Sequence, residues 1–127
     1  MNNYNIIKAD YNKYLELNGI LNSRCAMAQK IKDNNADYFY IEKDNEIIDD
    51  FAIYKDEKWF TLDKKYFENK DLIKVIFDEI KKKYEYIYIY VPVEQYEIIN
   101  FIKNNYRVES NIEEQFNHKF EHIKFNL

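Results

Sequence analysis

The chain has 127 residues, 46% of them hydrophobic, which suffices for one compact domain whose core needs no disulfide or metal. Its net charge is -4, and acidic and basic side chains alternate, so we expect neither a nucleic-acid partner nor an anionic membrane surface. The single cysteine excludes an internal disulfide, and neither a signal peptide nor an apolar run of about 18 residues occurs. These features predict one domain over residues 1–127, located in the cytoplasm.

The first half of the chain predicts a strand, two helices and three further strands. Asp10 can accept hydrogen bonds from first-turn amides, so a helix should follow it and run to about Leu21. Ser23 is expected to cap a second helix. Glycine and proline occur once each, so tight turns must come from Asn and Asp, which tolerate left-handed backbone. The expected strands span residues 4–9, 38–43, 46–54 and 58–63.

The second half places helices and strands around one central strand. Residues 86–91 alternate tyrosine with β-branched residues and are closed by Pro92, a pattern typical of a strand with its aliphatic side chains on one face. Asn69 or Asp71 can cap the helix before it. The other expected elements are helices over residues 72–83 and 94–105 and strands over residues 106–114 and 118–127.

Three groups of residues could carry chemistry, and each has a simpler interpretation. Cys25 would need a base and a lowered pKa to act as a nucleophile, so packing in the core is favoured. His118 and His122 have the spacing that binds zinc on a helix, but in a strand this step spans about 13 Å, so we expect no metal site. The tyrosines of the central strand could stack bases, but that strand carries no basic residues.

Two short motifs and the order of elements resemble the GNAT N-acetyltransferases. Residues 40–48 are similar to the family's hairpin, which usually has glycine where Asn45 stands. Residues 101–106 are similar to its signature of tyrosine, three residues, glycine and phenylalanine. The resemblance covers nearly the whole chain, and it implies an α/β (α+β) fold with a mixed central sheet of about six to seven strands and helices on both faces.

The resemblance also implies a cofactor and its site. In the family, acetyl-CoA enters between the strand that matches residues 58–63 and the strand that matches residues 86–91. Backbone amides near Leu62 would then contact the acyl carbonyl. The pyrophosphate rests on a glycine-rich loop at the start of the following helix, where amides and the helix dipole favour anions. Lys64, Lys65 and Lys70 flank this loop and could hold phosphates as point charges, or could be solvated loop lysines.

The chain departs from the family pattern at this loop and at the catalytic tyrosine. Glu68 and Asp71 place carboxylates beside a diphosphate site, where like charges repel. Ile73 adds a branched side chain where the backbone should approach the ligand. The tyrosine that can protonate the departing thiolate falls at Phe101, which has no proton to give. Tyr96 or a tyrosine of the central strand could stand in, so the catalytic residues stay unassigned.

Two functions of different classes follow from these observations. The first is a divergent acyl-CoA-dependent N-acyltransferase with an amine substrate. The second is a catalytically inactive GNAT-like module that binds no cofactor and serves a homodimer or another protein partner. The altered loop and Phe101 favour the second, whereas the prevalence of enzymes in the resembled family favours the first.

Overall fold

The structure is a computed structural model that describes residues 3–23 and 25–127. The chain divides into two compact units, Met1–Leu62 and Asp63–Leu127. The single domain expected over residues 1–127 stays a prediction. No helix in the described part of the chain is long and apolar enough to cross a membrane.

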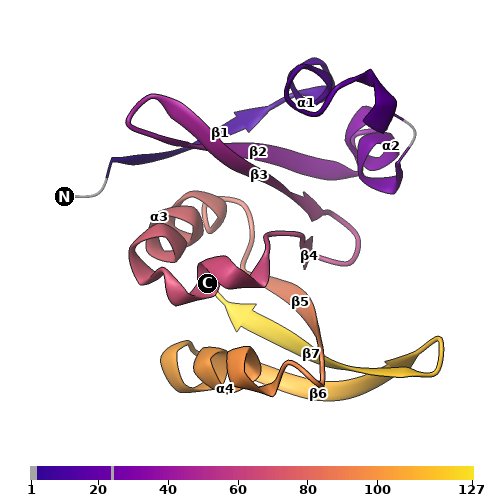
Figure 1. The fold of residues 1–127 in the computed structure, drawn as a ribbon, viewed down its shortest axis with the longest axis vertical. Coiled ribbons are helices and arrows are strands. Elements are labelled where there is room, and N and C mark those ends of the chain that lie inside the picture. Colours follow the sequence, from indigo (N-terminus) through magenta and orange to yellow (C-terminus); the bar gives the residue numbers. More distant parts are fainter. Residues whose placement is uncertain (1–2, 24) are drawn as a thin grey trace. The chain divides into compact units, whose positions relative to one another are not determined.

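The first unit is an antiparallel set of strands with two helices (Figure 1). Its strands are hydrogen-bonded in the order β1, β2, β3 and β4, each antiparallel to the next. Strands β2, β3 and β4 thus form an antiparallel meander, although β4 is far shorter than the strand expected over residues 58–63. The elements are β1 (Tyr4–Ala9), α1 (Tyr11–Asn18), a 3-10 turn (Ile20–Asn22), α2 (Ala26–Lys32), β2 (Ala36–Lys43), β3 (Glu46–Tyr54) and β4 (Trp59–Phe60).

The tight turns of the first unit use Asn and Asp, as the glycine content predicts. The hairpin between β2 and β3 turns at Asp44 and Asn45, whose φ angles are 52° and 68°. Asn34, after α2, has a φ of 60°. Lys58 breaks the rule with a φ of 56°, directly before β4. Short polar side chains thus supply most of the left-handed backbone that glycine supplies elsewhere.

The helix ends of the first unit correct two predictions. Asp10 caps α1 by accepting a 2.9 Å hydrogen bond from the Lys13 amide, as expected. The helix stops at Asn18 because Gly19 takes a φ of 82°, so Leu21 is 96% exposed and not on the helix face. The cap of α2 is Cys25 and not Ser23.

Helices α1 and α2 cover one face of the strands β2 and β3 (Figure 1). Tyr14 of α1 packs edge-on against Tyr38 of β2, with 5.3 Å between the ring centroids. The cluster between helices and strands consists of Tyr14, Ala28, Ile31, Ala36, Tyr38, Ala52 and Tyr54. These buried side chains form the core between the helices and the strands, and those of α1 and α2 lie on the apolar faces of the two helices.

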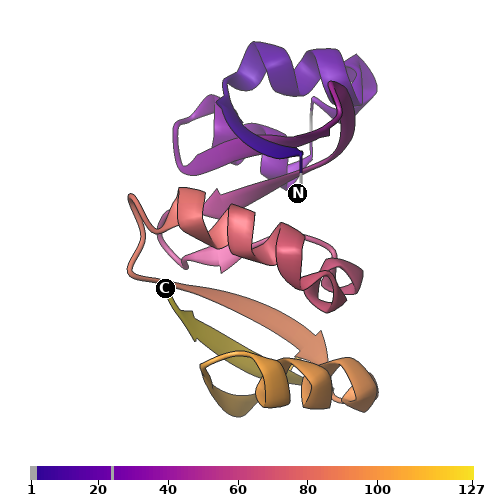
Figure 2. The same ribbon diagram turned by 90° about the vertical axis from the view of Figure 1, so that its left-hand side faces the viewer.

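The second unit holds three strands, two helices and a 3-10 turn. Strand β7 lies between β5 and β6 and is antiparallel to both. In Figure 2, α4 covers one face of these strands. The elements are the 3-10 turn η2 (Lys64–Glu68), α3 (Lys70–Ile80), β5 (Tyr86–Pro92), α4 (Tyr96–Asn105), β6 (Val108–Gln115) and β7 (His118–Asn126).

The central strand β5 has the two faces that its alternation predicts. Ile87, Ile89 and Val91 are fully buried, whereas the tyrosines between them are half-buried. On the tyrosine face, the ring of His122 on β7 stacks between Tyr88 and Tyr90, with centroid distances of 4.3 Å and 4.4 Å. The strand is therefore anchored on both faces.

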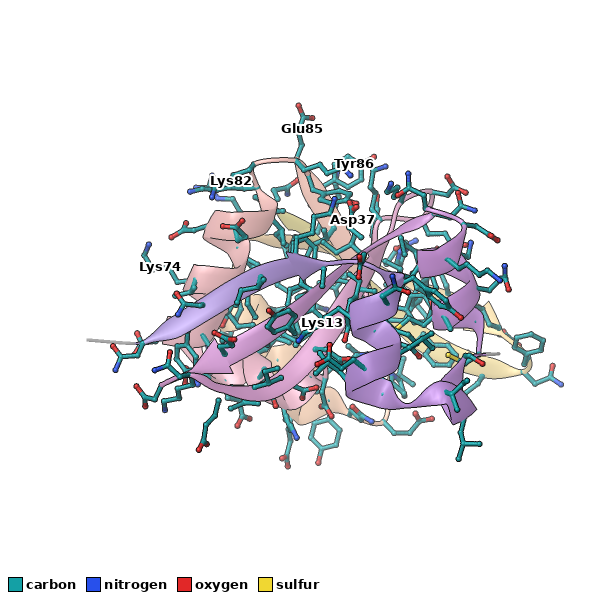
Figure 3. The ribbon with its side chains drawn as sticks, turned by 90° about the horizontal axis from the view of Figure 1, so that it is seen from above. Lys13, Asp37, Lys74, Lys82, Glu85 and Tyr86 are labelled. Atoms are coloured by element: carbon teal, nitrogen blue, oxygen red, sulfur yellow. The ribbon has the colours of Figure 1, made fainter. Side chains whose placement is uncertain are left out.

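The two helices of the second unit differ from their predicted bounds by two or three residues. Helix α3 begins at Lys70, two residues before the predicted start, and ends at Ile80. Lys74 on the exposed side of α3 and Lys82 in the turn after it point outward in Figure 3. Helix α4 begins at Tyr96, two residues after the predicted start. The buried side of the unit gathers the aromatic side chains of Phe67, Phe77, Tyr106 and Phe125.

Candidate functional site

The N-terminus of α3 is shaped by side chains and not by glycine. Asp63 caps the 3-10 turn by accepting a 3.0 Å hydrogen bond from the Lys65 amide. Asn69 then caps α3 by accepting a 3.1 Å hydrogen bond from the Leu72 amide. The loop contains no residue with positive φ, since none occurs between Trp59 and Gln115. This loop therefore needs no glycine to turn into the helix.

The helix end also presents the backbone amides of the first two residues of α3. Within the described residues, no group accepts a hydrogen bond from the amides of Lys70 and Asp71, the first two residues of α3. First-turn amides are without intrahelical partners, and the helix dipole adds a partial positive charge at the same place. The end of α3 can therefore receive an anion.

An open hollow of about 560 Å³ lies at this helix end, lined by Lys65, Glu68, Asn69, Lys70 and Asp71. The Lys65 ammonium lies 5.1 Å from the centre of the Tyr66 ring. The Lys70 ammonium lies 6.0 Å from the centre of the Phe101 ring on α4. Neither lysine forms an ion pair with any residue that the structure describes. The hollow thus combines two unpaired ammonium groups with two carboxylates.

The structure brings together two of the four residues predicted for cofactor binding. Lys65 and Lys70 line the same hollow, whereas Lys64 is half-buried at the start of η2 and is not part of the lining. Burial lowers the pKa of the Lys64 ammonium, which the neighbouring Asp63 carboxylate only partly offsets. Leu62 belongs to the first unit, follows the short β4 and is 1% exposed.

The predicted substitutes for a catalytic tyrosine lie in different surroundings. Phe101 is on α4 and carries the Lys70 ammonium over its ring, so it has a contact but no proton to donate. Tyr96 is the first residue of α4 and is 63% exposed. Tyr88 and Tyr90 stack on His122. No acid or base is singled out by these contacts.

Tyr106 fixes the loop before α3, a role that the sequence does not predict. The hydroxyl of Tyr106, directly after α4, donates a 2.6 Å hydrogen bond to the backbone carbonyl of Phe67 in η2. Desolvation by burial raises the pKa of Tyr106, so the hydroxyl stays protonated and can donate. The only signal in the sequence is that Tyr106 stands where the resembled signature has phenylalanine.

A second hollow, in the first unit, is bordered by a polar network. The Tyr38 hydroxyl and the Asn18 amide donate to one oxygen of Asp50, at 2.6 Å and 2.9 Å. Desolvation and the Asp50 carboxylate raise the pKa of Tyr38. The hollow has a volume of about 320 Å³ and is lined by Leu17, Asn18, Ile47, Ile48, Asp49 and Asp50.

The lone thiol and the two histidines contact separate groups. Cys25 is exposed, so the prediction that it packs in the core was wrong; it caps α2 because its sulfur accepts from the Ala28 amide at 3.4 Å. His118 and His122 both lie on β7 and approach different carboxylates, at 3.0 Å and 3.2 Å. In residues 3–23 and 25–127, no three metal-binding side chains gather into a group.

Comparison with solved structures identifies the fold. A variant of a spermidine N-acetyltransferase from Vibrio cholerae is similar with a TM-score of 0.61 and 12% identity, over 98% of this chain and 94% of that chain. An N-acetyltransferase from Staphylococcus aureus has a TM-score of 0.59 and 16% identity, with 97% of each chain covered. An acetyl-CoA-bound GNAT acetyltransferase from Elizabethkingia anophelis has a TM-score of 0.52 and 13% identity, over 98% of this chain and 99% of that chain.

These likenesses show that the chain has the α/β fold of the GNAT N-acetyltransferases, as its order of elements predicts. The low identities agree with a sequence that has diverged from the family's motifs. A scan of the sequence against family models finds no match, and a comparison with curated proteins finds no relative. The similarity to known proteins is therefore detected in the arrangement of helices and strands and not in the sequence.

Proposed function

We propose that this protein is a divergent acyl-CoA-dependent N-acyltransferase. One observation carries the proposal: in a chain with this fold, a hollow at the N-terminus of α3 brings together two lysines and two backbone amides that have no partner among the described residues. The neighbouring structure from Elizabethkingia anophelis contains bound acetyl-CoA, which supports this cofactor class. An amine is the substrate class that goes with it.

The loop would hold the diphosphate of the cofactor by charge. Ammonium groups bind phosphate as point charges, a role that fits Lys65 and Lys70 in the hollow. The amides of Lys70 and Asp71 would add directed hydrogen bonds. Lys64 is proposed as a further cation near the phosphates, and the backbone at Leu62 as a contact for the acyl carbonyl.

The two carboxylates of the hollow weaken this fit without removing it. Glu68 and Asp71 repel a diphosphate, so the affinity should be lower than that of a glycine-rich loop. Asp71 also has a structural role, because a carboxylate in the first turn of a helix stabilises it through the dipole. The two ammonium groups and the two carboxylates of the hollow cancel in net charge. The backbone amides at the helix end then favour binding of an anion.

The reaction would be a direct transfer of the acyl group. The amine nitrogen attacks the thioester carbonyl, a C–N bond forms, the C–S bond breaks, and the amine proton is lost to a base while the thiolate leaves or is protonated. Phe101 has no proton to donate to the departing thiolate. We assign no catalytic acid or base, because neither Tyr96 nor the tyrosines of β5 are distinguished by their contacts.

Calorimetric titration with acetyl-CoA tests the proposal. The wild-type protein should bind, and Lys70→Glu should weaken binding by at least about tenfold, because it reverses a charge beside the phosphates. Lys74→Glu is the matched control: Lys74 lies on the same helix but points outward, so its reversal should leave the affinity unchanged. Absence of wild-type binding at millimolar acetyl-CoA would overturn the proposal.

The alternative function is an inactive GNAT-like module that serves a homodimer or a protein partner. Phe101 favours it, since this position offers no proton to a thiolate. Incubation with acetyl-CoA and a panel of amines, followed by mass spectrometry, separates the two functions. Mass spectrometry is preferred to a thiol reagent because Cys25 is exposed. Cofactor binding without any acylated product would favour the module. A cytoplasmic location remains a prediction for either function.

A further inference from the structure

The loop before α3 is tied to the end of α4 by a partly buried hydrogen bond. The Tyr106 hydroxyl donates to the Phe67 carbonyl at 2.6 Å, across 39 positions of sequence. Phe67 belongs to η2, and its carbonyl lies two residues before Asn69, which caps α3. The bond therefore fixes the chain just upstream of the amides that face the hollow.

Both partners of this bond are held by ring packing. Phe67 is fully buried and stacks on Phe125 of β7, with 5.1 Å between centroids. The ring of Tyr106 stands edge-on to both, at 6.0 Å from Phe67 and 5.8 Å from Phe125. Helix α3 joins the cluster through Phe77, whose ring lies 6.3 Å from that of Tyr106. Such packing leaves the hydroxyl little freedom to choose another acceptor.

The hydroxyl is the part of Tyr106 that packing does not explain. Phenylalanine would fill the same place among the three rings, and phenylalanine is what the resembled signature has there. A hydroxyl that is partly withdrawn from water is unfavourable unless it is bonded, so its presence is accounted for by the Phe67 carbonyl.

We propose that Tyr106 is a positioning residue for cofactor binding. Acting through the Phe67 carbonyl, it holds η2 so that the Lys65 side chain and the amides of Lys70 and Asp71 converge on one hollow. Pre-organised groups bind a diphosphate without the loss of loop freedom that a mobile loop would suffer. This inference rests on the proposed function, because it names the device that shapes the same site.

The test uses Tyr106→Phe, which removes the oxygen and keeps the ring. Calorimetry on the full chain should show acetyl-CoA and ADP, which both carry a diphosphate, binding about tenfold more weakly. S-acetylpantetheine has no diphosphate, and its affinity, followed by NMR titration, should not change. Tyr86→Phe is the matched control, since within the described residues no hydrogen bond involves the Tyr86 hydroxyl and its ring lies on β5.

The outcomes separate this inference from the proposed function. If the wild type binds no acetyl-CoA, the proposed function fails and the inference with it. If the wild type binds and Tyr106→Phe binds equally well, only the inference is overturned. Equal weakening of S-acetylpantetheine would show a general structural effect and would also overturn it. Should Tyr106→Phe not fold, Tyr106→4-aminophenylalanine keeps a donor at the same place and must retain wild-type affinity.

Discussion

The two units use charged side chains in different ways. In the first unit, the buried Asp37 carboxylate, with 1% of its side chain exposed, has the ammonium groups of Lys8 and Lys55 at 3.4 Å and 3.8 Å. In the second unit, Lys65 and Lys70 form no ion pair with any described residue and line a hollow. A buried charge must be paired to be tolerated, whereas unpaired cations that gather at a helix N-terminus have no evident structural use.

The contrast lies between the loop and the rest of the molecule, because the second unit also pairs its buried charge. Glu121 on β7 is 8% exposed and lies 2.9 Å from the Lys103 ammonium of α4. In the first unit, even the lone thiol of Cys25 has a partner in the Tyr14 hydroxyl, at 3.1 Å. Both units thus pair their buried carboxylates with lysines, whereas the two lysines that line the hollow at α3 are left for a ligand.

The largest effect is expected from unpairing Asp37. The double variant Lys8→Met and Lys55→Met leaves a buried carboxylate without either cation, and we expect the free energy of unfolding to fall by about 3–5 kcal/mol. Urea denaturation followed by circular dichroism measures this change.

The matched control is the double variant Lys74→Met and Lys82→Met. These lysines pair with Asp78 and Glu79 at the surface, at 2.9 Å and 2.8 Å. Their removal should lower the free energy of unfolding by no more than about 1 kcal/mol in total. Equal losses in the two double variants would contradict the distinction between buried and exposed pairs.

The next effect is expected at Glu121, and it depends on pH. Burial raises the pKa of this carboxyl, but hydrogen bonds from Ser110 and Lys103 outweigh burial and bring it below its usual value. A lowered pKa stabilises the folded state above the pKa of the unfolded chain, and this stabilisation is lost as pH falls through the folded pKa. Lys103→Met should therefore lower the free energy of unfolding by about 1–3 kcal/mol at neutral pH.

The pH profile distinguishes this cause from lost packing. The difference between wild type and Lys103→Met should shrink as the pH falls below the usual carboxyl range, because protonation of Glu121 removes the charge to be paired. Chemical denaturation at a series of pH values measures it. A difference that stays constant down to the acid limit would assign the loss to the aliphatic part of Lys103.

Much of the fold could be predicted because its signals are local. The bounds of β1 and β3 match the prediction, since period-two runs and Asp or Asn turns define both. Asp10 and Asn69 act as caps, as their side chains predict. The errors lie at the ends of the helices in the first unit. A thiol caps α2, and Gly19 stops α1 three residues early.

The candidate site could be predicted only in part, because its key contact is not local. The order of elements located the loop, and Lys65 and Lys70 do line one hollow there. The bond from Tyr106 to Phe67 joins positions 39 residues apart, and no periodicity or spacing encodes it. The exposure of Cys25 was missed for a related reason: only the actual start of α2 decides which residue is its cap.

A smaller change in the free energy of unfolding is expected at the loop lysines. Its sign distinguishes a ligand-binding lysine from a structural one. Lys70→Gln should change the free energy of unfolding by less than about 0.5 kcal/mol, and in the stabilising direction, because a cation in the first turn opposes the helix dipole. The same variant should bind acetyl-CoA more weakly in calorimetry. A loss of stability above about 1 kcal/mol would instead mean that the contact of Lys70 with the Phe101 ring is structural.

The smallest effect concerns the thiol of the first unit. The hydrogen bond between the Tyr14 hydroxyl and the Cys25 sulfur, in which the hydroxyl must donate once the thiol is ionised, is the main reason why the pKa of Cys25 lies below its usual value, ahead of the opposing effect of burial. Tyr14→Phe removes this donor, so the pKa of the thiol should rise and the reaction with iodoacetamide at neutral pH should slow.

The pH dependence of alkylation, followed by mass spectrometry, is the measurement. Its midpoint should move to higher pH in Tyr14→Phe and stay in place in Tyr11→Phe, the neighbouring ring on α1, for which no hydrogen bond to Cys25 exists among the described residues. Because the lowered pKa favours the folded thiolate, the wild type should also gain stability relative to Tyr14→Phe as pH rises through the folded pKa of Cys25. An unchanged midpoint would show that the cap position on α2, where the sulfur accepts from the Ala28 amide, sets the thiol pKa without help from Tyr14.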